Sequence, residues 1–367
     1  MRQVVYVPIL KAKKGEYDAL LKVSPSARPL VLPLMELQEI PLSWKNHAPT
    51  RTLRDHLELL AKSIGAWSTS GGSNVLVEVG RFPESPKVAG ESPLEFIVKE
   101  ADRLGGKPVP VAGLRRTPGI RQATRRIAEN SSLGACVRLD GRDCLVPADV
   151  LDSQLDELLQ ELGVDRPSCD LLVDFGEIPA EHSGFTAQAA ASLINSLPEI
   201  ATWRNIITAG SSMPKTVSGL PLSEVVSVVR EEWIGWKALS EQVPLKRLPL
   251  FGDYGVAHPE SLEQGSFIGR NIAAKVRYTI DGAWILVRND TLKRGGDEQF
   301  HDLCALVCDH QAYCGPSFSW GDERIYKCSR RECGPGNLTT WVTAATSHHI
   351  AFVVSQLASE SEPSDNL

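Results

Sequence analysis

Short apolar runs alternate with helix-like stretches about eight times before residue 255, and each run ends in a charged or small polar residue. The runs cover residues 4–10, 30–35, 75–77, 109–114, 135–137, 171–173, 206–209 and 248–252. A strand followed by a helix, repeated about eight times, is typical of a closed (β/α)8 barrel. We therefore predict an α/β fold, a TIM-like barrel with its chemistry at the carboxyl ends of the strands.

The pattern changes after residue 260. Residues 275–280 and 283–288 flank Asp281-Gly282, which predicts a β-hairpin. Helices are expected over residues 298–310 and 343–357, and over residues 223–240 after the seventh strand. We predict a barrel core over residues 1–260, a C-terminal extension over 261–357 and a disordered tail over 358–367. The extension would lie over the barrel mouth and include the last barrel helix.

Composition narrows the classes of protein. The 367 residues carry a formal net charge of -6, so the chain is not basic overall, although a local patch for nucleic acid is not excluded. No apolar stretch is long enough to span a bilayer, so we expect no membrane contact. The first residues enter a strand at once, so no signal peptide is expected. The eight cysteines are then reduced thiols, and we expect a cytoplasmic protein.

Acidic residues end several of the predicted strands. A barrel would bring Glu36, Glu78, Asp174 and Asp253 together at its mouth, where they stay ionised only if cations balance them. Mg²⁺ or Mn²⁺ is one such cation. The alternative is a salt-bridged mouth in which arginines and lysines provide the balance. The cysteines Cys304, Cys308, Cys314, Cys328 and Cys333 lack a C-x-x-C spacing, so a structural zinc is not expected.

Other candidate residues lie at the ends of the last strands. Gly210, Ser211 and Ser212 follow the seventh strand, Gly252 ends the eighth, and Tyr254 comes shortly after it. Barrels often bind phosphate at these loops through exposed backbone N–H groups, although glycines also serve tight turns.

Basic and imidazole groups complete the candidates. Lys11 and Arg138 end strands and could bind an anionic substrate or balance the acidic ring. His258 and His349 are candidate proton-transfer groups, or else core and capping histidines.

Several motifs along the chain resemble those of the phage Beta protein family. They lie at residues 6–20, 33–36, 252–259, 275–279, 318–322, 336–341 and 348–350. The resemblance selects Lys11, Glu36 and Asp253 again, and it adds Tyr254, His258, Lys275, Arg277, Tyr278, Asp322, Asn337 and His349. It implies a context of phages and mobile or defence-associated bacterial loci, with links to phage exclusion and to neutralising a toxic neighbour. It brings no catalytic mechanism with it.

Two functions are consistent with these features. In the first, the protein is a defence or immunity component that binds a small anionic ligand, phosphate- or nucleotide-like, at its barrel mouth. It would act with a partner protein from the same locus. In the second, it is a metal-dependent hydrolase or phosphodiesterase. Glu36, Glu78, Asp174 and Asp253 would then hold the cation, Lys11 and Arg138 would stabilise developing charge, and His258 or His349 would move a proton.

Overall fold

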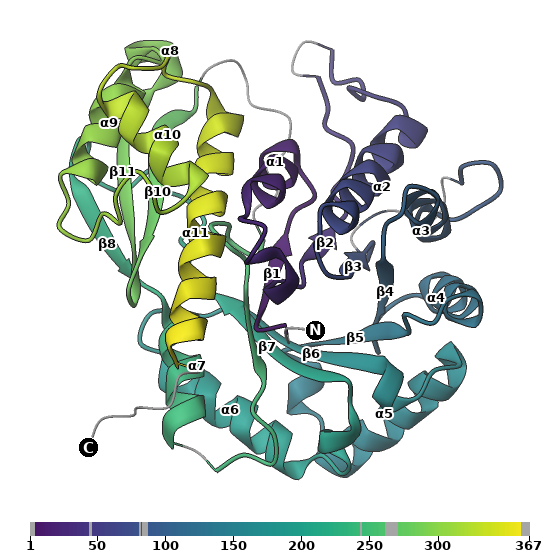
Figure 1. Cartoon of the computed structure of the whole chain (residues 1–367). Helices are drawn as coiled ribbons and strands as arrows, with labels where there is room; N and C mark the ends of the chain where they lie inside the picture. Colours follow the sequence, from purple (N-terminus) through teal and green to yellow (C-terminus); the bar gives the residue numbers. More distant parts are fainter. Residues whose placement is uncertain are drawn as a thin grey trace.

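Eight parallel strands close into a barrel in the computed structural model, which describes residues 4–43, 46–80, 82, 87–242, 244–260 and 271–360. The barrel strands are β1 (Tyr6–Leu10), β2 (Leu34–Glu36), β3 (Val75–Glu78), β4 (Pro108–Ala112), β5 (Ala135–Asp140), β6 (Cys169–Glu177), β7 (Asn205–Ser211) and β9 (Leu250–Asp253). Tyr6 pairs with Phe251, so β9 returns to β1 and closes the ring. The predicted (β/α)8 barrel is confirmed (Figure 1).

Helices follow the strands around the outside of the barrel. They are α1 (Lys14–Lys22), α2 (Leu53–Thr69), α3 (Pro93–Arg103), α4 (Pro118–Asn130), α5 (Ala148–Leu162), α6 (Ser183–Ser196), α7 (Glu231–Gln242) and α11 (Leu338–Glu360). Short 3-10 turns are η1 (Arg28–Leu30), η2 (Asp143–Leu145), η3 (Arg166–Ser168) and η4 (Ile200–Thr202). Thr52, Ser92 and Thr117 cap α2, α3 and α4 with their side-chain oxygens. These caps fix where each helix begins.

The barrel interior is apolar below the carboxyl ends of the strands. Val7, Ile9, Leu34, Leu76 and Val109 belong to one buried cluster that fills the space inside the strands. β-Branched and aliphatic side chains of this kind fill the centre of such barrels in layers. The polar residues at the strand ends therefore lie next to a packed layer of apolar side chains.

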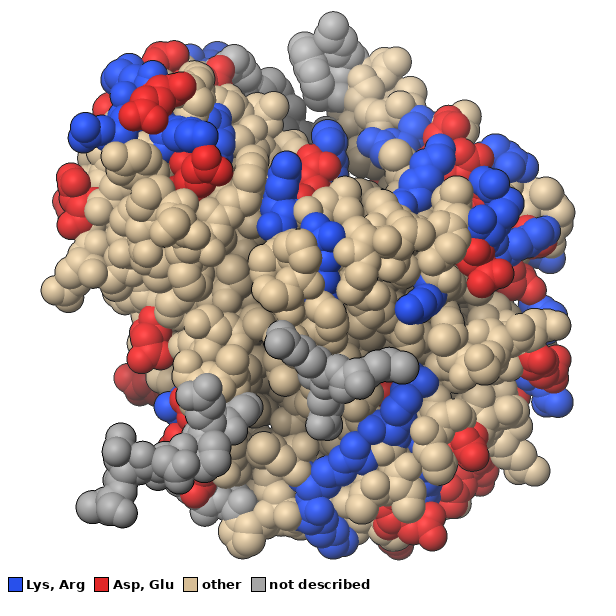
Figure 2. All heavy atoms as spheres, viewed as in Figure 1, with Lys and Arg blue, Asp and Glu red and all other residues tan. Residues whose placement is uncertain are grey.

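A second unit is built on a three-stranded antiparallel sheet in the order β10-β11-β8. Its elements are β8 (Val225–Val229), β10 (Ala273–Ile280), β11 (Ala283–Thr291), α8 (Leu292–Gly295), α9 (Gln299–Cys308) and α10 (Trp320–Ser329). The predicted hairpin is confirmed, and Gly282 in its turn has a positive φ of 65°. Figure 1 shows this unit gathered on one side of the barrel, next to α1 and α11, and in the same view Figure 2 shows basic and acidic side chains mixed at its top, around α8 and α9.

The strand β8 corrects one prediction. Residues 223–229 were expected to begin a helix, yet Val225–Val229 is a strand and the helix starts only at Glu231. Four valines in five residues favour a pleated strand, because a branched Cβ restricts the side chain in a helix. The strand lies between β7 and α7 in the chain and pairs with β11, which is more than 50 residues away.

The helix α11 completes the ring of helices. It packs on α1, and its residues Ile350, Val353 and Leu357 share a buried cluster with Phe251 of β9. The last predicted barrel helix is therefore present. It runs to Glu360, past the expected start of the tail at residue 358. The rest of that predicted tail, residues 361–367, lies outside the described residues.

Candidate functional site

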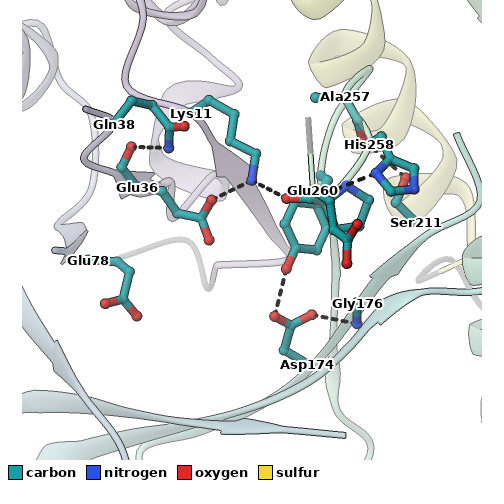
Figure 3. Close-up of polar contacts among 12 residues, drawn as sticks. Lys11, Glu36, Gln38, Glu78, Asp174, Gly176, Ser211, Ala257, His258 and Glu260 are labelled. Atoms are coloured by element: carbon teal, nitrogen blue, oxygen red, sulfur yellow. Dashed lines mark hydrogen bonds and ion pairs between the residues drawn. The ribbon is translucent and has the colours of Figure 1, made fainter. Parts of the chain in front are cut away.

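Charged side chains from six strands, β1 to β6, or from the loops that follow them, meet at the carboxyl end of the barrel. We define the mouth cluster as Lys11, Glu36, Glu78, Arg116, Arg138, Asp174 and Tyr254. Parallel strands all point their carboxyl ends to one side of the barrel, which brings residues far apart in the chain together. Figure 3 shows Lys11, Glu36, Glu78 and Asp174 turned toward a common space.

Glu36 bridges two cations of the mouth cluster. Lys11 Nζ donates to Glu36 Oε2 over 2.6 Å, and Arg138 Nη1 donates to Glu36 Oε1 over 2.8 Å. Glu78 lies beside the same guanidinium, 3.5 Å from Arg138 Nη1, and accepts from Arg116 Nη2 over 2.8 Å. One carboxylate thus separates Lys11 from Arg138, and the next separates Arg138 from Arg116.

The other side of Arg138 contacts Asp174 and Tyr254. Arg138 donates to Asp174 Oδ2 from Nη2 over 2.6 Å and from Nε over 3.0 Å. The same Nη2 lies 2.8 Å from the Tyr254 hydroxyl, which in turn donates to Asp174 Oδ2 over 2.6 Å. Arg138 is therefore the centre of the cluster, with contacts to residues of β2, β3, β6 and the segment after β9.

Burial makes these contacts electrostatically strong. The side chain of Arg138 is 6% exposed, and those of Lys11, Glu36 and Glu78 are 2% exposed. Burial lowers the pKa of Arg138, but Tyr254 and the surrounding carboxylates raise it well above its ordinary value. Arg138 accordingly keeps its charge, and the arginines and lysine balance the carboxylates within the cluster.

A loop covers this cluster. We name residues 254–260, which follow β9, the mouth cap. Lys11 Nζ donates to the Pro259 carbonyl over 2.6 Å, and Ser211 Oγ donates to the Ala257 carbonyl over 3.3 Å (Figure 3). His258 Nε2 lies 3.3 Å from Glu177 Oε2. The cap is thus tied to β1, β6 and β7 across the mouth.

The predicted metal ligands do not gather into one set. Glu36, Glu78 and Asp174 lie in the mouth cluster, each beside an arginine, whereas Asp253 contacts Tyr6 and His349. Among the residues that the structure describes, no three His, Cys, Asp or Glu side chains are placed to hold a metal ion. The geometry matches the salt-bridged mouth that the sequence analysis gave as the alternative.

Asp253 begins a second buried network, which joins the barrel to the extension. The Tyr6 hydroxyl donates to Asp253 Oδ1 over 2.5 Å, and His349 Nε2 lies 2.8 Å from Asp253 Oδ2. His349 Nδ1 lies 2.8 Å from Thr279 Oγ1 of β10. Arg230 Nη2 lies 3.8 Å from Asp253 Oδ2. The network therefore connects β1, β9, α11 and β10.

The same chain of contacts continues into the extension. His348 Nε2 lies 2.7 Å from the Thr279 carbonyl, and His348 Nδ1 lies 2.9 Å from Asp322 Oδ2. The Tyr278 hydroxyl donates to Asp322 Oδ1 over 2.7 Å. We define the seam network as Tyr6, Arg230, Glu232, Asp253, Tyr278, Thr279, Asp322, His348 and His349.

Burial shifts the ionisation of the seam network. It lowers the pKa of His349 despite the neighbouring Asp253. Burial alone would raise the pKa of Asp253, but His349, Arg230 and the Tyr6 hydroxyl lower it below its ordinary value. Burial raises the pKa of Glu232 to about 7. A neutral His349 beside an ionised Asp253 suits a hydrogen bond that fixes the imidazole, as in a structural contact.

Four other predicted residues make local packing contacts or hydrogen bonds. A Cβ on Gly210 would lie 2.5 Å from Ile178, and one on Gly252 would lie 3.0 Å from the Val7 carbonyl oxygen, so both glycines allow close packing. Ser212 Oγ donates to the Val229 carbonyl over 2.8 Å. Asn337 accepts from the Thr340 N–H over 3.1 Å at the start of α11.

Other predicted residues belong to the extension. Lys275 and Arg277 lie on β10, as does Tyr278 of the seam network. The cysteines of the described chain are free thiols, and the pKa of Cys328 is lowered to about 7 through Cys304, with His301 also beside it. These positions are set by the sheet and helices of the extension and are distinct from the mouth cluster.

Sequence reasoning missed Tyr6, Arg230, Glu232 and Thr279 as partners of Asp253 and His349. Tyr6 and Thr279 lie inside strands, where they read as ordinary strand residues, and Arg230 and Glu232 flank the start of a helix. The pairing of Asp253 with His349 joins residues 96 apart. No spacing of residues in the sequence predicts such a contact.

The comparison with known families agrees with the motifs. A family model described as Beta protein matches residues 6–355, nearly the whole chain. The chain belongs to the Beta protein family. The match includes the barrel, the extension and most of α11, so the family relationship extends to both the mouth cluster and the seam network. No curated protein matches this Beta protein. Within its described residues, no helix is long and apolar enough to cross a membrane.

Proposed function

We propose that this Beta protein is a component of a phage-defence or immunity system that binds a small anionic ligand at its barrel mouth. The ligand is phosphate- or nucleotide-like, and the protein acts in the cytoplasm with a partner protein from the same locus. The observation that supports this proposal is the buried mouth cluster, in which Lys11, Arg116 and Arg138 converge at the strand ends.

Burying the charges of the mouth cluster costs free energy that stabilising the fold does not require. Moving an ion out of water costs several kcal/mol, and a buried ion pair seldom recovers more than a packed apolar pair would supply. Lys11, Glu36 and Arg138 are nevertheless all buried. Retained charge at the functional end of a barrel therefore favours ligand binding over stability.

The arrangement of the cations favours an anion. Glu36 presents its two oxygens to Lys11 and Arg138, which is the way these two groups would hold two oxygens of a phosphate. Arg116 is the most accessible cation of the cluster, with 23% of its side chain exposed. Opening of the mouth cap would release the Lys11 ammonium from the Pro259 carbonyl. The Glu36 carboxylate, which bridges Lys11 and Arg138, then occupies the place that the phosphate group of the ligand would take.

A thermal-shift assay tests the ligand class. Unfolding is followed for the wild type with inorganic phosphate, a panel of nucleotides, Mg²⁺ or Mn²⁺. A ligand that binds only the folded state raises the Tm, by several degrees at about 100 times its Kd. We expect nucleotide or phosphate to raise the Tm without metal. The Arg116→Gln variant should lose the response, and Arg125→Gln, which removes an exposed arginine of α4, should keep it.

Two outcomes of this assay contradict the anion-binding proposal. A rise with Mg²⁺ or Mn²⁺ alone, abolished by Glu36→Gln, favours the metal-dependent hydrolase instead. No response to any anion also overturns the proposed ligand, even if the defence role stands.

A plaque assay tests the defence role separately. Cells that carry the locus with the wild-type gene should reduce plating of a challenge phage, and deletion of a neighbouring gene should remove that protection if a partner is needed. Arg116→Gln should weaken protection, whereas Arg125→Gln should not. Equal plating with and without the gene across the phage panel would overturn the defence proposal.

A further inference from the structure

The strand β8 forms one edge of the extension sheet. It pairs with β11 and with no other strand in the described part of the chain. Figure 1 shows β8 at the outer side of the molecule, on the far side of β11 from the barrel helices α1 and α11. Its second edge therefore presents a row of backbone donors and acceptors that a further strand can use.

The register of β8 shows which backbone groups face outward. Val229 lies opposite Ala283, and the Arg230 N–H donates to the Gly282 carbonyl over 2.9 Å. Hydrogen-bonded pairs alternate along an antiparallel ladder, so Val226, Val228 and Arg230 face β11. The N–H and C=O groups of Val225, Ser227 and Val229 then point to the open edge. The Val229 carbonyl at the end of the strand already accepts from Ser212 Oγ, which lies off β11 in agreement with this parity, so a further strand would share that carbonyl through its second lone pair.

The side chains on this edge are apolar and accessible. Val225 is 39% exposed and Val229 is 46% exposed, and Ser227 between them is exposed as well. Natural edge strands are usually protected by lysine, proline, a bulge or a covering element. The strand β8 contains neither a charge nor a proline and pairs with β11 without a register shift.

The sequence of β8 identifies the partner. It reads Val-Val-Ser-Val-Val and is the same in both directions about Ser227. An antiparallel pair of two such strands places a two-fold axis at Ser227, and each Val225 then lies opposite Val229 of the partner subunit. Val225 and Ser227 have backbone groups that face outward, so their pairs across the axis are the hydrogen-bonded ones. The pair of Val226 with Val228 of the partner subunit is a non-hydrogen-bonded one between them.

We propose that the Beta protein forms a two-fold symmetric dimer by pairing β8 with the β8 of a second copy. The two sheets then join into one continuous sheet in the order β10-β11-β8-β8-β11-β10. Two-fold dimers are the commonest closed assemblies, because one surface serves both partners. This inference stands apart from the proposed ligand, since β8 contributes no residue to the mouth cluster.

Molar mass in solution tests the dimer. Light scattering or sedimentation on the full chain, from about 1 to about 100 µM, should show a mass that rises to that of two chains with concentration. The double variant Val225→Lys, Val229→Lys places lysines opposite lysines across the axis and should be monomeric at the same concentrations. Val150→Lys, on an equally exposed valine of α5, is the matched control and should remain dimeric.

A charge-swap experiment tests the register. Val225→Glu, Val229→Glu should also be monomeric alone, but its mixture with the double-lysine variant should give a heterodimer, because each lysine then faces a glutamate. Hydrogen exchange of the wild type gives an independent readout, with protection of Val225, Ser227 and Val229 amides that grows with protein concentration.

Three results would overturn the proposal. They are a wild type that stays monomeric at the highest concentration, a dimer that persists in the double-lysine variant, and a pairing with some other protein's strand in place of the second copy. If a variant fails to fold, the concentration dependence of wild-type exchange still decides the question.

Discussion

The molecule holds two buried polar networks that differ in composition. The mouth cluster joins charge to charge, with Arg138 between Glu36 and Asp174. The seam network interleaves ions with neutral groups, as where the Tyr6 hydroxyl and His349 contact Asp253. Both are made by residues far apart in the sequence. The mouth cluster joins strand ends across the carboxyl face of the barrel, where such folds carry their chemistry, whereas Asp253 of the seam network also ends a strand but contacts His349 of α11.

The difference separates the proposed ligand site from a structural contact between the barrel and the extension. In the seam network each polar atom of Asp253 and Asp322 has a fixed partner from another element, so the network holds β10 and α10 to the barrel. In the mouth cluster the cations are held by carboxylates that a ligand could replace. The hydroxyls and imidazoles of the seam network thus stabilise the docking of the extension on the barrel. The buried charges of the mouth cluster instead support the proposed binding of an anionic ligand.

The largest effect should come from the centre of the mouth cluster. Arg138→Met leaves Glu36 and Asp174 buried with one cation fewer, and we expect a loss of about 3–5 kcal/mol in the free energy of unfolding, measured with urea. Adding Asp174→Asn to the same chain removes the carboxylate left without a cation, because Glu36 keeps Lys11 and Glu78 keeps Arg116, and it should restore much of the loss. A single variant as stable as the wild type would show that the cluster is not a coupled set.

A smaller effect with opposite sign should come from Glu232 in the seam network. Its pKa is about 7 in the folded protein and 4.5 without the fold. The folded state therefore binds the proton more tightly, and Glu232 lowers stability as pH rises from 4.5 to 7. Glu232→Gln removes this cost, so the variant should exceed the wild type by about 2 kcal/mol at pH 8.

Urea titrations at two pH values check the sign for Glu232. The two proteins should converge near pH 5, where Glu232 is protonated in the folded state. A variant that is less stable than the wild type at pH 8 would mean that the carboxylate is needed by Arg230, which lies 3.5 Å away.

The smallest effect should come from the far end of the seam network. Tyr278→Phe removes the hydroxyl that donates to Asp322 and accepts from the Cys314 N–H, and keeps the ring that stacks on His348. We expect a loss of about 1 kcal/mol in the free energy of unfolding, from urea titration. Tyr326→Phe, on a partly buried tyrosine of α10, is the control. A loss as large as that of Arg138→Met would place Tyr278 among coupled charges.

The barrel was predictable because its signal is periodic. Each strand is a short apolar run that ends in a polar residue, and Lys11, Glu36, Arg138 and Asp174 are selected by that position alone. The strand β8 was missed although its valines favour a strand, and its pairing with β11, more than 50 positions away, could not be read from the sequence. Asp253 was placed correctly on its strand, but its partners depend on how the extension docks.

The same separation explains the histidines. His348 and His349 are adjacent in the chain, and a helix turns them toward different neighbours, Asp322 and Asp253. His349 was a candidate for proton transfer, and its burial and fixed partners match the alternative of a core histidine. The packing of α11, and not the type of side chain, shows which groups each histidine contacts.

The position of α11 has a consequence for synthesis. The barrel strands are complete at Asp253, yet the helix that covers the junction of β9 and β1 begins only at Leu338. A chain still emerging from the ribosome therefore holds Phe251 and its apolar neighbours uncovered until Ile350, Val353 and Leu357 arrive. Premature termination anywhere in the extension would leave this apolar surface around Phe251 exposed. Every incomplete product then becomes a target for chaperones and proteases.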